Sequence, residues 1–389
     1  MNHSNLNFFS YNQPYDFNES KDQENNIPSN IKINQDKQED ICLKKQKKKV
    51  YIISNIKEGG SVKYINDITR HYNKYVDFIF IRNKSELLKI SHFFMPDDIL
   101  FVQQLLYTDI LPEFLLKIKT IFSLKMIISI HDFCWFIDDD DDVNNPTKIT
   151  NIFEIGYFSN LTRIQSNIVT LFENAFLVIH PSEFTKKQYS RFFPITNCIL
   201  QDHNDIHVNY HAKSIPIITN NTIKICNFQS YSKCKGSEMM ELLLEKYKSY
   251  KGYIINFLII SKNNLHYTEE NWHIMLKNMN PHCLLHLNKY GETYSYSLSK
   301  SINSGLPILY NDLGSFKERI PKNNKHYKSV ISNEDEYYHS NKLFVKFEEM
   351  LEYIIENNGK WEIQHFNNEI IYKELYDNLF CKEKSVELV

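Results

Sequence analysis

Short apolar runs rich in β-branched residues alternate with amphipathic stretches in the first half of the chain, beginning at Val50. The apolar runs predict strands, and the stretches with apolar positions three and four residues apart predict helices. The predicted strands cover residues 50–54, 76–81, 99–102, 126–130 and 176–180, and the predicted helices cover residues 61–72, 85–90, 111–122 and 182–192. Strands and helices that alternate in this way are typical of a parallel, doubly wound sheet.

The alternation stops at a polar, irregular stretch, residues 213–222, and then restarts. The second series predicts strands at residues 223–228, 254–260, 283–287 and 307–310, and helices at residues 237–250, 269–277, 295–304 and 343–357. We therefore expect an α/β protein with two Rossmann-like, doubly wound domains that face a cleft and are joined by a linker. The first domain is expected over residues 49–215, and the second, with a terminal helical segment, over residues 216–389.

Residues 1–48 differ in composition from the rest of the chain, because they are rich in Asn, Gln, Ser, Asp and Lys. They show neither a helical nor a strand period and cannot bury enough apolar surface to offset the entropy of ordering. We expect a disordered polar tail. The basic run Lys44 to Lys49 at its end is more typical of a solvated flank than of a nuclear-localisation or nucleic-acid segment.

Length and charge narrow the function classes. A chain of 389 residues suits two domains of roughly 100–200 residues each. Its 45 Lys and Arg against 47 Asp and Glu give a formal charge of -2, which argues against a nucleic-acid partner. No apolar run approaches the ~18 residues of a spanning helix, so we expect a protein without a transmembrane segment, and peripheral membrane contact stays open.

Cysteine usage indicates the compartment. The seven cysteines form no CxxC pair, which favours reduced thiols over a disulfide framework or a zinc site. We therefore expect a soluble, cytoplasmic protein.

Two loops of the first domain carry candidate binding groups. Gly59 and Gly60 follow the first strand, where they allow the backbone to approach a ligand, and Ser61 is expected to cap the next helix. A plain tight turn would explain the same glycines. His131 and Asp132 follow the strand at residues 126–130, and a histidine there can donate to a ligand hydroxyl or to a developing charge.

A lysine begins the candidate chemistry of the second domain. Lys235 and Gly236 precede the helix predicted from residue 237. An ammonium close to a helix N-terminus is a suitable counter-charge for a diphosphate, although an exposed Lys-Gly turn is also common. The absence of a Gly-x-Gly-x-x-Gly motif argues against a dinucleotide cofactor.

The segment from His282 to Tyr310 is the most informative stretch of the chain. It predicts a strand, a polar loop, a helix, a Gly-Leu-Pro turn and another strand. This order places the carboxylate of Glu292 and the N–H groups at the start of a helix at the carboxyl end of a parallel strand, where open α/β sheets bind ligands. These N–H groups belong to Thr293, Tyr294, Ser295 and Tyr296. We expect a site for a phosphorylated ligand there.

The order of five such elements, over about residues 49–360, resembles the retaining glycosyltransferases of family four. The elements are Gly59-Gly60, His131-Asp132-Phe133-x-Trp135, Pro181-Ser182-x-Phe184-Thr185, Lys235-Gly236, and Glu292-Thr293-Tyr294-Ser295-Tyr296-Ser297-Leu298-Ser299 followed by Gly305-Leu306-Pro307. The resemblance implies the two-domain GT-B fold. It also implies that Glu292 contacts the donor sugar, that His131 lies beside the transferred sugar, and that Asp132 is on the acceptor side. Contact with the donor diphosphate is implied for Gly59, Gly60, Lys235, Gly236 and the N–H groups of Thr293, Tyr294, Ser295 and Tyr296.

Two positions depart from the family pattern. Ser230 stands where many members have an arginine, and Lys300 stands where the second carboxylate of the family usually holds the ribose. Lys300 is therefore expected among the residues that bind the diphosphate, as a further cation.

The resemblance implies a glycosyltransferase that moves a sugar from a nucleotide-diphosphate-sugar donor to a glycan, lipid or protein acceptor with retention of configuration, without a metal or cofactor. Two alternatives remain open. One is a non-catalytic binding or scaffold protein built on a decayed transferase, indicated by Ser230 and Lys300. The other is a nucleotide-sugar epimerase of the same fold, whose acid and base the sequence does not reveal.

Two signals that would suit a metal are better explained otherwise. The acidic run Asp138 to Asp142 is followed by Asn and Pro, which is typical of a solvated loop. His203, His207 and His211 have helical spacing, but the residues between them do not form a convincing helical pattern. His203 and Asp205 resemble a His-x-Asp element of the family at the interdomain connection, so we expect a hinge or ligand-edge role there.

Overall fold

In the computed structural model, the described part of the chain begins at Lys47 and has several gaps. The described residues are 47–56, 59–105, 108–136, 165–201, 203, 216–260, 271–322, 324, 326–331, 340–359 and 373–381. The predicted tail therefore lies outside the described residues except for its last two, and one of these, Lys48, begins the first strand. The proposed end of the tail at residue 48 was too late, because Lys48 already pairs with Val76 in the sheet.

The first sheet consists of six parallel strands in the order β2-β1-β3-β4-β5-β6. The strands are β1 (Lys48–Ile53), β2 (Val76–Ile81), β3 (Ile99–Val102), β4 (Lys125–Ser129), β5 (Leu177–His180) and β6 (Cys198–Leu200). The helices between them are α1 (Gly60–Tyr72), α2 (Lys84–Ser91), α3 (Pro112–Phe122), α5 (Ser166–Glu173) and α6 (Glu183–Tyr189). Helix α6 begins as the sequence predicts, since Ser182 Oγ accepts a hydrogen bond from the Thr185 N–H at 3.1 Å.

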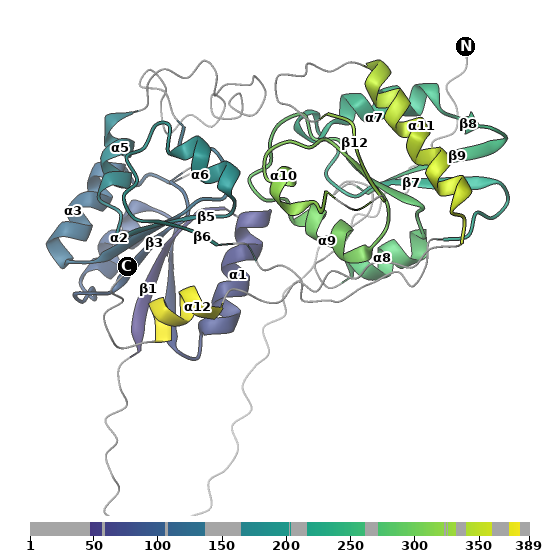
Figure 1. Ribbon diagram of the computed structural model, residues 1–389. Coiled ribbons are helices and arrows are strands. Elements are labelled where there is room, and N and C mark those ends of the chain that lie inside the picture. Colours follow the sequence, from purple (N-terminus) through teal and green to yellow (C-terminus); the bar gives the residue numbers. More distant parts are fainter. Residues whose placement is uncertain are drawn as a thin grey trace, which may run out of the picture. The chain divides into compact units, whose positions relative to one another are not determined.

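Helices cover both faces of this sheet (Figure 1). Alternate side chains of β1 point to opposite faces, as a strand requires. Tyr51 and Ile53 join the core under α2, α3 and α5, whereas Val50 and Ile52 join the core under α1. Burial on both faces explains why the strands read as continuous apolar runs in the sequence.

The second sheet also has six strands, in the order β12-β11-β10-β7-β9-β8, and all of its pairs are parallel except β8 with β9. The strands are β7 (Thr222–Asn227), β8 (Ser249–Tyr250), β9 (Tyr253–Ile259), β10 (Cys283–His286), β11 (Ile308–Tyr310) and β12 (Tyr327–Ser329). The helices are α7 (Ser237–Lys246), α8 (Trp272–Met279), α9 (Tyr296–Ser304), α10 (Phe316–Arg319) and α11 (Ser340–Glu356), with a 3₁₀ turn, η3, at Lys233–Lys235. Side chains of α7 and α11 pack in the core on one face, and side chains of α8, α9 and α10 pack in the core on the other.

Strand order reverses once in each sheet, and such a reversal is where open α/β sheets bind ligands. In the first sheet, β1 lies between β2 and β3, and in the second sheet, β7 lies between β9 and β10. The loops that follow β1, β3, β7 and β10 therefore gather at the carboxyl edges of the two sheets. These loops contain most of the residues that the sequence singles out.

Most predicted elements occur within a few residues of their expected bounds, and the corrections have local causes. The helix predicted over residues 237–250 ends at Lys246, because Tyr247 has a non-helical backbone and the chain then enters β8. The sequence pattern also missed α5. It missed β6, β8, β12 and α10 because these elements are too brief to show a period.

The last described segment returns to the first sheet. It consists of α12 (Lys373–Tyr376) and a π-helical turn, η4 (Asp377–Cys381). Tyr376 and Phe380 are buried in the core under α1, and the hydroxyl of Tyr376 hydrogen-bonds the hydroxyl of Tyr64. The sequence assignment grouped this segment with the second domain, but burial of its aromatic side chains puts it in the first. None of the helices in the described ranges is long and apolar enough to cross a bilayer.

Candidate functional site

The loops after β7 and β10 meet because Gly236 permits a very close approach. Gly236 has a φ of +80°, and a Cβ atom at this position would collide with the carbonyl oxygen of Leu287, just past the end of β10. Any other residue would suffer both backbone strain and this collision. The Lys289 N–H also donates to the Cys234 carbonyl at 3.0 Å. The turn that carries Lys235 is therefore fixed against the loop that carries Glu292.

Lys235 and Glu292, which the sequence assigned separate roles, contact each other. Lys235 Nζ donates to Glu292 Oε1 in an ion pair between side chains that are 28% and 18% exposed. The side-chain amide of Asn288 donates to the same oxygen. Glu292 thus has a cation and a neutral donor on one carboxylate oxygen, in a half-buried environment where such charge-assisted contacts are stronger than in water.

Two buried asparagines, neither of which was predicted from the sequence, form a chain of hydrogen bonds that ends at Glu292. Asn311, which follows β11, donates its side-chain amide to the Asn288 carbonyl at 2.8 Å. Both residues are at most 1% exposed, and within the described part of the chain the Oδ1 atoms of both have no hydrogen-bond partner. Both asparagines come directly after an apolar strand in the sequence, and this position was the signal that could have identified them. A buried amide normally has hydrogen-bond partners, so a buried asparagine at the end of a strand indicates a polar contact there.

The segment around Gly314 shapes the loop that carries Glu292. Gly314 forms a parallel bridge with Glu292, has a φ of +60°, and leaves no space for a Cβ atom next to the Glu292 backbone. The Ser315 N–H donates to the Glu292 carbonyl at 2.9 Å. Three residues after Glu292, Ser295 has a φ of 74° and caps α9, because its side chain accepts a hydrogen bond from the Leu298 N–H at 3.4 Å. Glu292 consequently lies immediately before the N-terminus of α9.

The residues from Thr293 to Tyr296, which follow Glu292 and reach the first turn of α9, contact residues of the first domain. Thr293 Oγ1 donates to the His131 carbonyl at 2.5 Å, and the Tyr294 hydroxyl donates to the His203 carbonyl. The Tyr296 hydroxyl is 3.0 Å from His203 Nδ1. The structure thus brings together the His131 loop, the Glu292 loop and His203.

The glycine loop after β1 lies against Tyr296, the first residue of α9. A Cβ atom on Gly60 would lie 2.8 Å from ring carbons of Tyr296, so the small residue at this position makes room for that ring. Gly59, with a φ of +94°, has open space around its Cα. Helix α1 begins at Gly60 without a side-chain cap, so the expected capping role of Ser61 was wrong.

The imidazole of His131 is neutral, and only one of its two nitrogens has hydrogen-bond partners among the described residues. Its Nε2 is 3.3 Å from the Gln103 side-chain amide nitrogen and 3.1 Å from Ser129 Oγ. The same amide of Gln103 donates to the Ser61 carbonyl at 2.6 Å, so Nε2 accepts and the proton is on Nδ1. Nδ1 is buried and has no partner among the described residues. Burial lowers the pKa of His131 to about 3, so it can donate a hydrogen bond from Nδ1 without carrying a charge.

Asp132 is half-buried and Lys300 is buried. Asp132 Oδ1 accepts from the Cys134 N–H at 2.9 Å, its carbonyl accepts from the Tyr189 hydroxyl at 2.7 Å, and burial raises its pKa. These contacts explain Asp132 as a residue that shapes the turn after β4. Lys300 lies on α9, one turn after Tyr296, and is 4% exposed.

Acid is expected to destabilise the protein through its buried histidines. Burial is the main reason that the pKa values of His131 and His286 are about 3 in the folded protein, against 6.5 for an ordinary histidine. Below pH 6.5 these histidines bind protons in the unfolded chain but not in the folded chain. Their contribution to the free energy of unfolding is therefore fully present above pH 6.5 and is lost as the pH decreases toward 3. Each such group contributes about 1.4 kcal/mol per pH unit in this window.

Urea unfolding at neutral pH and at about pH 5 tests this expectation, since ordinary carboxyl groups titrate mostly below that range. The variant His286→Asn removes one buried imidazole, whose Nε2 is 2.7 Å from Ser301 Oγ. The variant should lose less stability between the two pH values than the wild type. An equal loss would show that His286 does not contribute.

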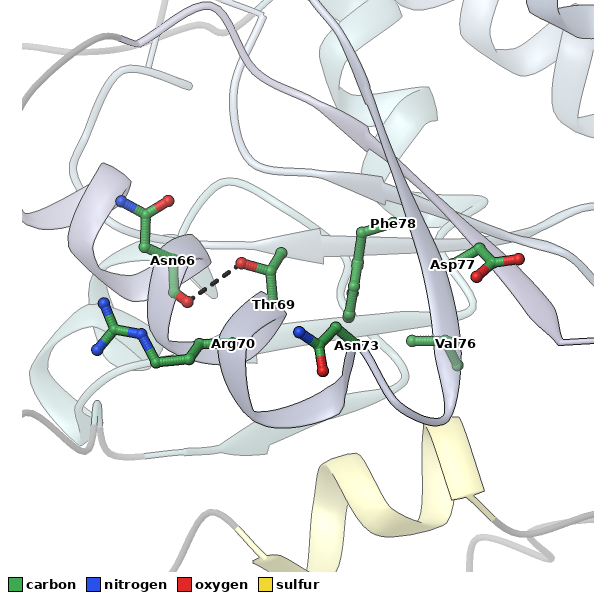
Figure 2. Close-up of a pocket in the computed structure, with 7 residues that line it drawn as sticks. All are labelled: Asn66, Thr69, Arg70, Asn73, Val76, Asp77 and Phe78. Atoms are coloured by element: carbon green, nitrogen blue, oxygen red, sulfur yellow. Dashed lines mark hydrogen bonds between the residues drawn. The ribbon is translucent and has the colours of Figure 1, made fainter. Parts of the chain in front are cut away.

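The surface depression in Figure 2 is not part of this arrangement. It lies where α1 ends and β2 begins, at the amino end of that strand, and none of the predicted site residues lines it. Its lining consists of Asn66, Thr69, Arg70, Asn73, Val76, Asp77 and Phe78. Among the described residues, no group of three or more His, Cys, Asp or Glu side chains could hold a metal. The acidic run at residues 138–142, and also Asp205, His207 and His211, lie outside the described residues.

Comparison with known proteins decides the fold. No protein-family model matches the sequence, and no curated protein matches it. Among solved structures, the sucrose-phosphate synthase of Thermosynechococcus elongatus superposes with a TM-score of 0.51 at 10% identity, over 79% of this chain and 90% of that one. Anabaena HepE, in complex with UDP and glucose, superposes with a TM-score of 0.50 at 12% identity, over 81% of this chain and 94% of that one. The chain has the GT-B fold. The predicted pair of Rossmann-like domains is thereby confirmed.

Proposed function

We propose that this protein is a glycosyltransferase that moves a sugar from a nucleotide-diphosphate-sugar donor to an acceptor hydroxyl with retention of configuration. The contact between Lys235 and Glu292 beside the N-terminus of α9 carries the proposal. A donor offers a diphosphate, which suits a cation and helix N–H groups, and sugar hydroxyls, which suit a carboxylate. The GT-B fold of HepE, whose structure contains UDP and glucose, is consistent with this assignment.

The proposed mechanism is front-face transfer. The bond between the sugar and the diphosphate breaks, and Lys235 together with the first N–H groups of α9 stabilises the charge that develops on the leaving diphosphate. Glu292 holds the donor sugar, and the neutral His131 donates from Nδ1 to a sugar oxygen. The acceptor hydroxyl forms the new bond on the same face and gives its proton to the leaving diphosphate. In this scheme, the second domain binds the donor and the first domain contributes the acceptor side.

A screen of nucleotide sugars tests the proposal. The donor should raise the melting temperature by binding the folded state, and it should be hydrolysed slowly without an acceptor. The anomeric configuration of the released sugar, followed by NMR, tests retention. Stabilisation without turnover would instead support a binding protein, the alternative that Ser230 and the buried Lys300 favour. Release of an epimerised sugar would support an epimerase. No stabilisation by any nucleotide sugar would contradict all three functions.

The role of Asn288 leads to a pH-dependent prediction. The change Asn288→Asp replaces the amide that donates to Glu292 Oε1 with a second carboxylate of nearly the same shape. Two carboxylates that share one site cannot both ionise readily, so the pKa of the pair rises. Donor hydrolysis should fall on the order of tenfold at neutral pH and recover partly toward acid pH, because a protonated carboxyl again donates to Glu292.

The pH–rate profile of Asn288→Asp is the measurement. Asn324→Asp is the matched control, since Asn324 is a buried asparagine of the same domain whose Oδ1 accepts from the His326 N–H at 2.9 Å. Its profile should resemble that of the wild type. If Asn288→Asp gives the wild-type profile as well, the amide of Asn288 does not govern the charge on Glu292.

A further inference from the structure

Arg319 holds the loop between Glu292 and α9 from one side. The residue belongs to α10, and its Nη1 donates to the carbonyls of Tyr294 and Ser295, the latter at 3.0 Å. Its Nη2 donates to Ser299 Oγ, and its guanidinium lies over the Tyr294 ring, 3.6 Å from the centroid. The planar guanidinium spaces its N–H donors over several nitrogens and presents a flat face to the ring, whereas an ammonium carries its three donors on one atom. Nothing in the sequence pattern indicated this residue.

Because Arg319 holds two peptide carbonyls, it also sets the direction of the N–H groups of the same peptides. In a trans peptide, the C=O and the following N–H point in opposite directions, and the described residues contain no cis peptide bond. When Arg319 fixes the carbonyls of Tyr294 and Ser295, it turns the N–H groups of Ser295 and Tyr296 away from the guanidinium. These are two of the N–H groups that the proposed function assigns to the donor diphosphate.

The charge of Arg319 adds to this orientation. None of the ion pairs within the described ranges involves Arg319, and its charge acts directly on the two peptide carbonyls that it contacts. A cation that binds a peptide oxygen polarises the peptide and strengthens its N–H as a donor. The neighbouring Ser315 hydroxyl donates to the Tyr294 carbonyl at 3.1 Å, but it is neutral and polarises the peptide less.

We propose that Arg319 is a positioning residue for the donor diphosphate, which acts through the peptides of Tyr294 and Ser295 without touching the ligand. This inference rests on the proposed function and deepens it. The Arg319 side chain is half-buried, and its two terminal nitrogens donate to the Tyr294 and Ser295 carbonyls and to Ser299 Oγ, which directs the guanidinium at the backbone of the loop. The simpler alternative is that Arg319 only stabilises the turn at Ser295, where the φ of 74° is strained for a residue with a side chain.

Diphosphate binding, compared with nucleoside binding, separates these two roles. The probes are UDP, GDP, ADP and dTDP with their nucleosides, titrated into the full chain by calorimetry, and the pair that the wild type binds is used for the variants. Arg319→Met removes the charge and the fork, and it should weaken diphosphate binding on the order of tenfold or more. The affinity for the nucleoside should stay unchanged. Arg319→Lys retains the charge and should recover part of the diphosphate affinity.

Two further variants serve as controls. Ser315→Ala removes a neutral hydrogen bond to the same Tyr294 carbonyl and should cost less diphosphate affinity than Arg319→Met. Arg191→Met changes an exposed arginine of the first domain whose Nη1 donates to the Gln188 side chain, and it should have no effect. Melting temperatures identify any variant that fails to fold, in which case Arg319→Lys alone decides through its ratio of diphosphate to nucleoside affinity.

The outcomes for this inference and for the proposed function are distinct. A wild type that binds no nucleoside diphosphate would overturn the proposed function together with this inference. A wild type that binds one, with Arg319 variants that bind it equally well, would overturn only the role of Arg319. Variants that lose diphosphate and nucleoside affinity to the same extent would show a general effect on the loop and would also overturn it.

Discussion

Glu292→Gln is expected to reduce sugar transfer on the order of 10²- to 10³-fold while the fold and its melting temperature remain close to those of the wild type. Glutamine keeps the shape of the side chain, and its carbonyl oxygen can still accept from Lys235 and Asn288. The charge at the proposed position of the reacting sugar is lost. Because the loop backbone is fixed by Gly314 and Ser315, the substitution should not move the N-terminus of α9.

The matched control is Glu238→Gln. Glu238 also lies near a lysine, with 3.5 Å between its carboxylate and Lys289 Nζ, but this pair is exposed and belongs to the same domain. Exposed ion pairs of this kind contribute little, so the control should transfer sugar at the wild-type rate. Near-normal kcat/KM for Glu292→Gln, measured with the donor that the screen identifies, would remove Glu292 from the catalytic centre.

Lys235→Ala should weaken donor binding and slow turnover, with a combined loss of about 2–4 kcal/mol in the transition state. The ammonium is the proposed counter-charge of the leaving diphosphate, and it also forms an ion pair with Glu292. Its removal therefore leaves a half-buried carboxylate without its cation, which repels the incoming donor. Both effects act in the same direction on kcat/KM.

Lys289→Ala tests whether any lysine of this region would have the same effect, and it should be nearly neutral because the Lys289 side chain is 40% exposed. Lys300→Ala, alone and combined with Lys235→Ala, tests whether Lys300 has taken over part of the contact with the diphosphate. If it has, the double variant should lose more than the sum of the single losses. An unaffected Lys235→Ala variant would refute the assignment of Lys235 to the diphosphate.

The sequence predicted where the loops that carry the candidate residues lie, because these loops follow the ends of strands. Lys235 and Glu292 each follow an apolar run, and the loops of adjacent parallel strands converge at one edge of a sheet. The sequence also singled out Gly236, but it did not reveal why a glycine is needed there. Only the structure shows that Gly236 packs on the Leu287 carbonyl. The local sequence pattern was therefore enough to locate the loops, but the contact between the two loops could be identified only from the folded structure.

The supporting residues could not be predicted because their partners are distant in sequence. Gln103 contacts His131 from the loop after β3, Asn311 reaches Asn288 from the loop after β11, and Arg319 reaches the Tyr294 carbonyl from a helix of only four residues. Such pairings leave no period in the sequence. The same limit applies to Tyr376, whose hydroxyl meets that of Tyr64 across 312 positions of the chain.

The return of residues 373–381 to the first sheet constrains the order of events during synthesis. Tyr376 and Phe380 complete the core under α1, yet the ribosome makes them after the whole second domain. Until they emerge, the apolar side chains of Tyr64 and Tyr72 lack the aromatic neighbours that bury them in the finished protein. The first domain therefore begins folding first but finishes last, and during that interval its uncovered face is open to aggregation or to a chaperone.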